Sequence, residues 1–137
     1  MGDRIFPMKE STVVRDISRQ LRSAKRFFVN NHGTIMSQSG VPDFITMDET
    51  TRFLAIEAKA PGQKPRVNQM RRALEILKSG GRYVVAYAGF DLLDLDKEVS
   101  PTTQRIIIPE VVVGDTEFEL VDNFPPTISG SIEYVLE

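Results

Sequence analysis

The sequence predicts an α/β fold in which helices pack on a central mixed β-sheet. Apolar residues recur at helical spacing in two segments, 8–28 and 65–78. Between them, two strand-like runs, 41–47 and 52–59, flank a tight polar turn and predict a hairpin. The second helical segment leads into the apolar run 82–88. A strand that is reached through a helix is expected to lie parallel to its neighbour. With a short first strand at 34–36, the predicted order is helix, three strands, helix, strand.

The first helix is expected to begin near Met8, after Pro7, and to end before residues 30–33. Glu10 lies on its apolar stripe rather than on the opposite, basic side. A carboxylate on a core-facing stripe is costly unless it is paired or bound to a metal, although at a frayed first turn it can reach water or favour the helix N-terminus. Both interpretations of Glu10 stay open on spacing alone. The stripe consists of Val13, Val14, Ile17, Leu21, Ala24 and Phe28.

The remaining elements follow from turn and breaker residues. A short strand is predicted at 34–36, before a polar loop at 37–40. Pro65 suits the first position of a second helix that runs to about Lys78, and Gly80 and Gly81 end it. Beyond Gly89, a short helix is expected at 91–98 and short strands at 105–108, 111–113, 117–121 and 132–136.

Charge divides the chain into two regions. Residues 1–89 hold 15 Lys and Arg against 8 Asp and Glu, whereas residues 90–137 hold 2 against 11. We interpret residues 1–89 as a basic core suited to nucleic acid, and residues 90–137 as an acidic, β-rich extension of the same domain. The alternative is that the two charges are solvated faces of one compact domain.

Composition excludes several kinds of site. The chain has no Cys, which excludes disulfides and cysteine-ligated metals, and it has one His, which excludes two-His zinc sites. That residue, His32, is expected to be a loop or substrate-side residue. No phosphate-binding loop or dinucleotide fingerprint occurs, so no nucleotide cofactor is expected. We see no signal peptide or membrane-length apolar run, and therefore expect a cytoplasmic protein without a membrane partner.

The prediction of a catalytic site depends on two short motifs, Pro42-Asp43 and Glu57-Ala58-Lys59. A hairpin centred near Thr50 places Asp43 opposite Glu57, with Cβ atoms roughly 4.5–5.5 Å apart. Lys59 projects from the same face as Glu57 because the side-chain period of a strand is two. Two carboxylates suit Mg²⁺ or Mn²⁺, and with a lysine they suit hydrolysis of a phosphate ester. The alternative is an Asp at a strand start and a Glu–Lys pair at a strand end, without a catalytic role.

The second predicted helix adds further candidates. Gln69 lies near the start of this helix, where its amide is suited to contact DNA or to hydrogen-bond the ligands of a metal ion. The alternative is an ordinary exposed helical residue. Several basic residues nearby either contact phosphates or form a solvated face. These are Lys64, Arg66, Arg71 and Arg72.

Together, four motifs resemble those of the PD-(D/E)XK nuclease superfamily, and most closely its VRR-NUC (virus-type replication–repair nuclease) branch. The motifs are Gly40-Val41-Pro42-Asp43-Phe44, Glu57-Ala58-Lys59, Asn68-Gln69 and Gly80-Gly81. The resemblance covers residues 8–89 and implies a restriction-endonuclease-like core, with residues 90–137 outside it. It implies that Lys59 is the catalytic lysine and Gln69 the active-site glutamine. The metal ligands that it implies are Glu10, Asp43, Glu57 and the backbone carbonyl of Ala58.

The same resemblance implies a DNA endonuclease that depends on Mg²⁺ or Mn²⁺. Small members are similar to Holliday-junction resolvases, which act as dimers, so we expect branched or four-way-junction DNA as substrate and a homodimer. Ala73 stands where RecB-like relatives carry a tyrosine, which argues against a RecB-type exonuclease. Two alternatives remain, a non-catalytic DNA-binding or assembly module with the same fold, and a sequence-specific restriction-type nuclease.

Overall fold

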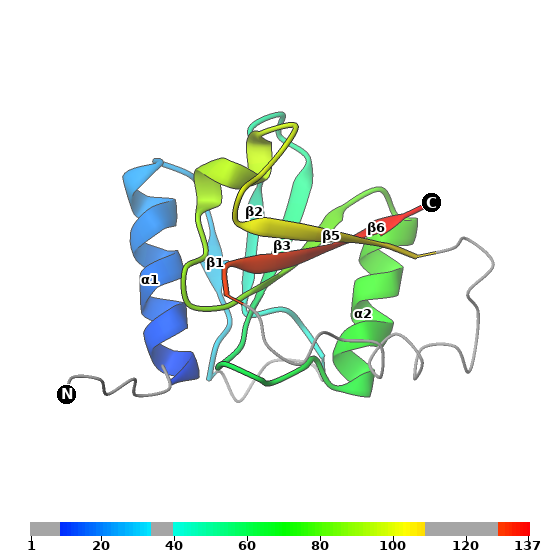
Figure 1. Ribbon diagram of the computed structural model, residues 1–137, viewed down its shortest axis with the longest axis horizontal. Coiled ribbons are helices and arrows are strands. Elements are labelled where there is room, and N and C mark those ends of the chain that lie inside the picture. Colours follow the sequence, from blue (N-terminus) through cyan, green and yellow to red (C-terminus); the bar gives the residue numbers. More distant parts are fainter. Residues whose placement is uncertain (1–8, 34–39, 109–128) are drawn as a thin grey trace.

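The computed structural model describes residues 9–33, 40–108 and 129–137. These residues form a six-stranded mixed sheet with the strand order β1-β2-β3-β4-β6-β5. Two α-helices and one short 3₁₀ helix pack on it (Figure 1). The helices are α1 (Glu10–Ser23), α2 (Val67–Lys78) and η1 (Leu92–Asp96). The strands are β1 (Val29–Asn30), β2 (Phe44–Met47), β3 (Phe53–Ala58), β4 (Arg82–Ala86), β5 (Thr103–Ile108) and β6 (Ser131–Leu136).

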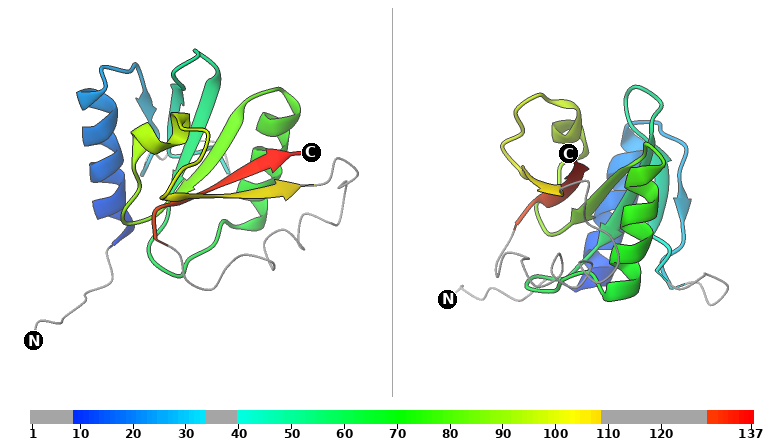
Figure 2. Two further views of the ribbon diagram at one scale, coloured as in Figure 1. Left: turned by 45° about the horizontal axis from the view of Figure 1, so that its top comes forward. Right: turned by 90° about the vertical axis from the view of Figure 1, so that its right-hand side faces the viewer.

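The sheet separates two hydrophobic cores, because alternate residues of its central strands point to opposite faces. On one face, Ile56 of β3 packs in a cluster with Ile17 of α1. On the other, Val85 of β4 packs in a cluster with Met70 of α2. The two α-helices therefore cover different faces (Figure 2). This arrangement confirms the predicted α/β, restriction-endonuclease-like fold with a central mixed sheet.

Helix α1 is shorter than the sequence predicted. It ends at Ser23, and Lys25 adopts a left-handed conformation with a φ of 58°. The backbone N–H of Arg26 donates to the carbonyl of Leu21, which closes the helix with a Schellman-type turn. The chain then runs into β1, a two-residue strand in the segment that was predicted to be helix or helix break.

The hairpin has the predicted register. Phe44 pairs with Ile56 and Met47 with Phe53, so the hairpin is centred at Thr50. Asp48 holds the turn, because its Oδ1 accepts hydrogen bonds from the backbone N–H groups of Thr50 and Arg52, both at 2.9 Å. Continuation of this register places residue 43 opposite residue 57.

The last strands complete the same sheet. β4 is parallel to β3, as predicted, and β6 lies between β4 and β5, antiparallel to the first and parallel to the second. Residues on both sides of position 89 thus contribute to one sheet, and η1 lies in the segment predicted as a short helix. The strands predicted at 34–36, 111–113 and 117–121 lie outside the described residues. Within the described ranges, no helix has the length and apolar character needed to cross a membrane.

Candidate active site

The predicted site residues meet at the end of the sheet where α1 and α2 both begin (Figure 1). Glu10 is the first residue of α1, and Gln69 lies in the first turn of α2. Asp43 directly precedes β2, and Glu57 is the fifth residue of β3. Two helix starts and one hairpin therefore bring residues that are widely separated in the sequence to the same end of the sheet.

A glycine lets the Pro42-Asp43 loop approach α2. Gly40 has a φ of 78°, and a Cβ placed on it would lie 2.5 Å from the backbone carbonyl oxygen of Asn68. Glycine is favoured at such a position because it has no Cβ and tolerates positive φ. The loop that carries Asp43 is thereby seated against the first turn of α2.

Asp43 is fixed by its neighbours on three sides. Its Oδ2 accepts a hydrogen bond of 2.9 Å from the backbone N–H of Ala58. Its own backbone N–H donates to Oε1 of Glu57 at 3.3 Å. Its Oδ1 lies 3.1 Å from Nδ1 of His32. The Asp43 side chain is 13% exposed, so it can still be reached from outside.

Glu57 is buried and is held by Gln69. Only 2% of its surface is exposed, and its Oε2 accepts a hydrogen bond from Nε2 of Gln69. Oε1 of Gln69 accepts a hydrogen bond of 2.8 Å from the backbone N–H of Arg66, which fixes the orientation of the amide. Gln69 is itself 4% exposed, which excludes its interpretation as an ordinary exposed helical residue.

The site favours the neutral form of Glu57 when no cation is bound. Burial, followed by the negative charges of Asp43 and Glu10, raises the pKa of Glu57 to about 8 despite the opposing effect of Lys59. A divalent cation beside these carboxylates would remove their mutual repulsion. The donor set therefore fits a hard divalent cation.

Lys59 lies inside the site rather than in solvent. It is 6% exposed, and its backbone N–H donates to the carbonyl of Ala86 at 2.9 Å, which ties the end of β3 to β4. Its positive charge lowers the pKa of Glu57 and so opposes the effect of burial on that carboxyl. A buried cation at this point can stabilise negative charge on a bound substrate.

Among the residues that the structure describes, three side chains offer metal ligands at close range, and one of them was not predicted as a ligand. Atoms of Glu10, His32 and Asp43 all lie within 4.8 Å of one another. Glu57 stands next to this group through the backbone of Asp43 but is not one of the three. The carbonyl of Ala58 stays a predicted ligand.

Pairing of β1 with β2 brings His32 to the site. The backbone N–H of Asn31 donates to the carbonyl of Asp43 at 2.6 Å, so the turn after β1 lies directly beside Asp43. The sequence placed His32 in a loop or on the substrate side, and it does lie in a turn. Only the position of β1 shows that its ring contacts Asp43, and a two-residue strand leaves no periodicity to find in the sequence.

The predicted DNA-binding residues lie before and along α2. Lys64, Arg66 and Arg71 are exposed, and Arg72 is half-buried with its Nη1 3.0 Å from Oε1 of Glu75. Their position beside the start of α2 is compatible with contacts to phosphate, which stay a prediction.

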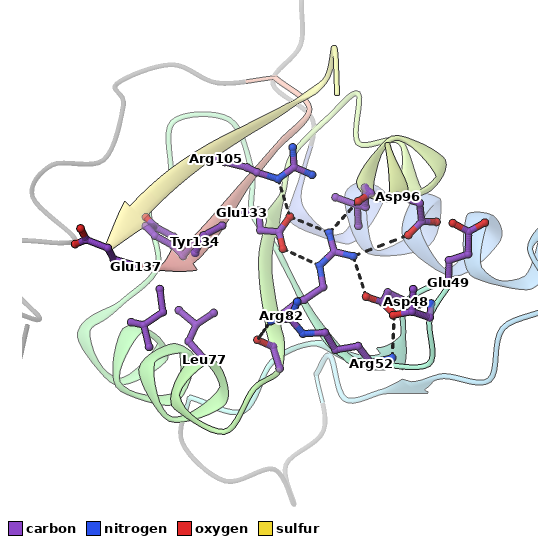
Figure 3. Close-up of a pocket in the computed structure, with 15 residues that line it drawn as sticks. Asp48, Glu49, Arg52, Leu77, Arg82, Asp96, Arg105, Glu133, Tyr134 and Glu137 are labelled. Carbon is purple, nitrogen blue, oxygen red and sulfur yellow. Dashed lines mark hydrogen bonds and ion pairs between the residues drawn. The ribbon is translucent and has the colours of Figure 1, made fainter. Parts of the chain in front are cut away.

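A second polar cluster lies at the opposite end of the sheet and lines a pocket of about 670 Å³ (Figure 3). Nε and Nη2 of Arg82 donate to the carboxylate of Glu133 at 2.7 and 2.9 Å, and Nη1 donates to Asp48 at 3.1 Å. Nη2 also donates to the carbonyl of Leu95 at 2.9 Å. Because these groups satisfy one another, we interpret the cluster as structural.

The raised pKa of Glu57 predicts how stability depends on pH when metal is removed. Between the ordinary pKa of 4.5 and the folded-state value of about 8, the folded protein holds a proton that the unfolded chain has lost. The protonated carboxyl of Glu57 therefore contributes its full stabilisation below the ordinary pKa of 4.5. That stabilisation is lost as pH rises through the folded-state pKa of about 8. In EDTA, the Tm of the wild type should therefore fall between pH 5 and pH 8.5 more than that of Glu57→Gln. Parallel Tm profiles for the two proteins would contradict this.

Comparison with known proteins assigns the family. The model of the VRR-NUC domain matches residues 8–89, which is more than half of the chain. Neither the comparison with curated proteins nor the comparison with solved structures found a match. The matched range includes both helix starts and the hairpin that build the site. The chain therefore belongs to the VRR-NUC domain family of nucleases.

Proposed function

We propose that this protein is a divalent-metal-dependent DNA endonuclease that hydrolyses phosphodiester bonds, with branched or four-way-junction DNA as its preferred substrate. Mg²⁺ or Mn²⁺ is the proposed cofactor. The observation that supports this best is the convergence of Glu10, Asp43 and the buried Glu57 with Lys59 at one end of the sheet. A purely structural role would not account for three carboxylates and a lysine gathered there.

The site residues divide into metal ligands, a catalytic lysine and a positioning residue in the proposed reaction. Glu10, Asp43 and Glu57 would hold the cation, together with the carbonyl of Ala58. The chemistry supplied by a bound cation is activation of the attacking water and neutralisation of charge at phosphorus and the leaving oxygen. Lys59 stabilises charge that develops on the scissile phosphate. Gln69 acts as a positioning residue, because it holds Oε2 of Glu57.

Two features support the proposed preference for branched DNA, namely the basic charge of residues 1–89 and the proposed homodimer. Residues 1–89 carry an excess of basic residues, and Lys64, Arg66 and Arg71 are exposed near the site. Basic side chains bind the phosphate backbone without reading sequence, which favours recognition of DNA shape. A homodimer would present two sites to the two strands of a junction.

Cleavage of matched linear, flap, fork and four-way-junction DNA tests this proposal. We expect cutting with Mg²⁺ or Mn²⁺, none in EDTA, and the highest rate on the four-way junction. Sedimentation of the protein with and without the junction measures whether the active species is a dimer. Absence of cutting on every substrate would favour a non-catalytic DNA-binding module, and cutting of linear duplex at one fixed sequence would favour a restriction-type nuclease.

Substitution of Lys59 tests whether this residue acts in the chemical step or in metal binding. Lys59→Ala should reduce the single-turnover cleavage rate by about 10²–10³-fold, the usual effect of removing one group that stabilises transition-state charge. Calorimetry should show Mn²⁺ affinity little changed, because Lys59 is not a proposed ligand. Loss of Mn²⁺ binding together with activity would contradict this role.

A further inference from the structure

We propose that His32 is a nitrogen ligand of the metal ion and that it makes the site favour Mn²⁺ over Mg²⁺. This inference rests on the metal dependence proposed above. It adds a ligand of a different chemical kind to a site otherwise made of oxygen donors.

The positions of the donor atoms support ligation. Nδ1 of His32 lies 3.1 Å from Oδ1 of Asp43 and 3.6 Å from Oε2 of Glu10. Neighbouring ligands of an octahedral ion with bonds of about 2.1 Å are about 3 Å apart. The imidazole nitrogen thus stands at ligand spacing from Asp43 and within a small side-chain movement of that spacing from Glu10.

The backbone holds His32 in this place. The N–H of Asn31 donates to the carbonyl of Asp43 at 2.6 Å, and the side chain of Asn31 donates to the carbonyl of Pro42 at 3.3 Å. The N–H of His32 donates to Oδ1 of Asn30 at 2.9 Å. The turn that carries the imidazole is therefore tied to the segment that carries Asp43.

Ligand chemistry gives the expected selectivity. Carboxylate oxygens suit Mg²⁺ and Mn²⁺ alike, whereas an imidazole nitrogen is a softer donor that transition metals accept more readily. Mg²⁺ retains water and oxygen ligands. Loss of His32 should therefore weaken Mn²⁺ binding much more than Mg²⁺ binding.

Affinity alone does not distinguish a ligand from a positioning residue. A side chain that only hydrogen-bonds a metal ligand also costs 10–100-fold in metal affinity when it is removed. The composition provides a direct readout instead, because His32 is the only histidine in the chain. Any imidazole nitrogen found on a bound ion must then come from this residue.

The experiment is pulsed electron paramagnetic resonance of Mn²⁺ bound to the full chain without a histidine tag. We expect an imidazole ¹⁴N coupling that becomes a ¹⁵N coupling when the protein is grown with ¹⁵N-histidine. Mn²⁺ bound one-to-one without this coupling would overturn the inference and leave the proposed metal dependence standing. Absence of Mn²⁺ binding by calorimetry would overturn both.

His32→Gln tests the selectivity. The coupling should disappear, Mn²⁺ affinity should fall about tenfold or more, and Mg²⁺ affinity should change little. An equal loss for both ions would overturn the selectivity and assign His32 a positioning role. His32 is 30% exposed on its side chain, so the exchange should leave the fold intact, which circular dichroism checks.

Discussion

Asp43→Asn should abolish DNA cleavage while the protein remains folded. The variant keeps the shape of the side chain and an oxygen for the N–H of Ala58, but it loses the charge that would hold the cation. Metal-assisted charge stabilisation contributes several kcal/mol, so the single-turnover rate should fall by about a thousandfold or more. Glu57→Gln should behave in the same way. In EDTA above pH 8, where Glu57 is ionised, both variants should melt no lower than the wild type, because each removes a repulsion between carboxylates.

A matched carboxylate outside the site provides the control. Glu75 lies towards the end of α2, away from the site at its start, and it is exposed and pairs with Arg72. Glu75→Gln changes charge by the same amount, and it should leave the cleavage rate near that of the wild type. Activity retained in either Asp43→Asn or Glu57→Gln would show that the site has been assigned wrongly.

The part of the site built by the hairpin could be predicted from the sequence. A tight turn at Asp48 and a strand period of two are both local properties, and together they set Asp43 opposite Glu57. The start of α2 was also signalled locally, by Pro65. The sequence resemblance then added Glu10 and Gln69, which spacing left undecided.

Non-local contacts account for what the sequence did not show. Lys25 takes a left-handed conformation that is usually occupied by glycine, so the end of α1 carried no recognisable signal. Strand β1 has only two residues, both exposed, and no alternation. The insertion of β6 between β4 and β5 depends on packing across the sheet. For this reason the contact of His32 with Asp43, which depends on β1, and the ion pair of Glu133 with Arg82, which depends on β6, were not predicted.

Arg82→Met should cost about 3–5 kcal/mol of the free energy of unfolding, because it removes the guanidinium that the buried carboxylates of Glu133 and Asp48 share. Those residues are 4% and 8% exposed. Figure 3 shows the guanidinium of Arg82 between them. Urea unfolding monitored by circular dichroism measures the loss. Arg105→Met is the control, since Arg105 is about one-third exposed and contacts Glu133 at 3.3 Å, and it should cost less than about 1 kcal/mol.

The same cluster tests our proposal that residues 90–137 are an extension of the domain formed by residues 1–89. Arg82 belongs to β4 and Glu133 to β6, so their ion pair joins the two regions across neighbouring strands. Arg82→Met combined with Glu133→Leu removes both charges of this pair, and it should recover part of the stability lost in Arg82→Met, because Asp48 stays buried without Arg82. In every variant the two regions should unfold in one transition with the m-value of the wild type. A separate, earlier transition in Arg82→Met would show that residues 90–137 fold independently, and recovery would then not be expected.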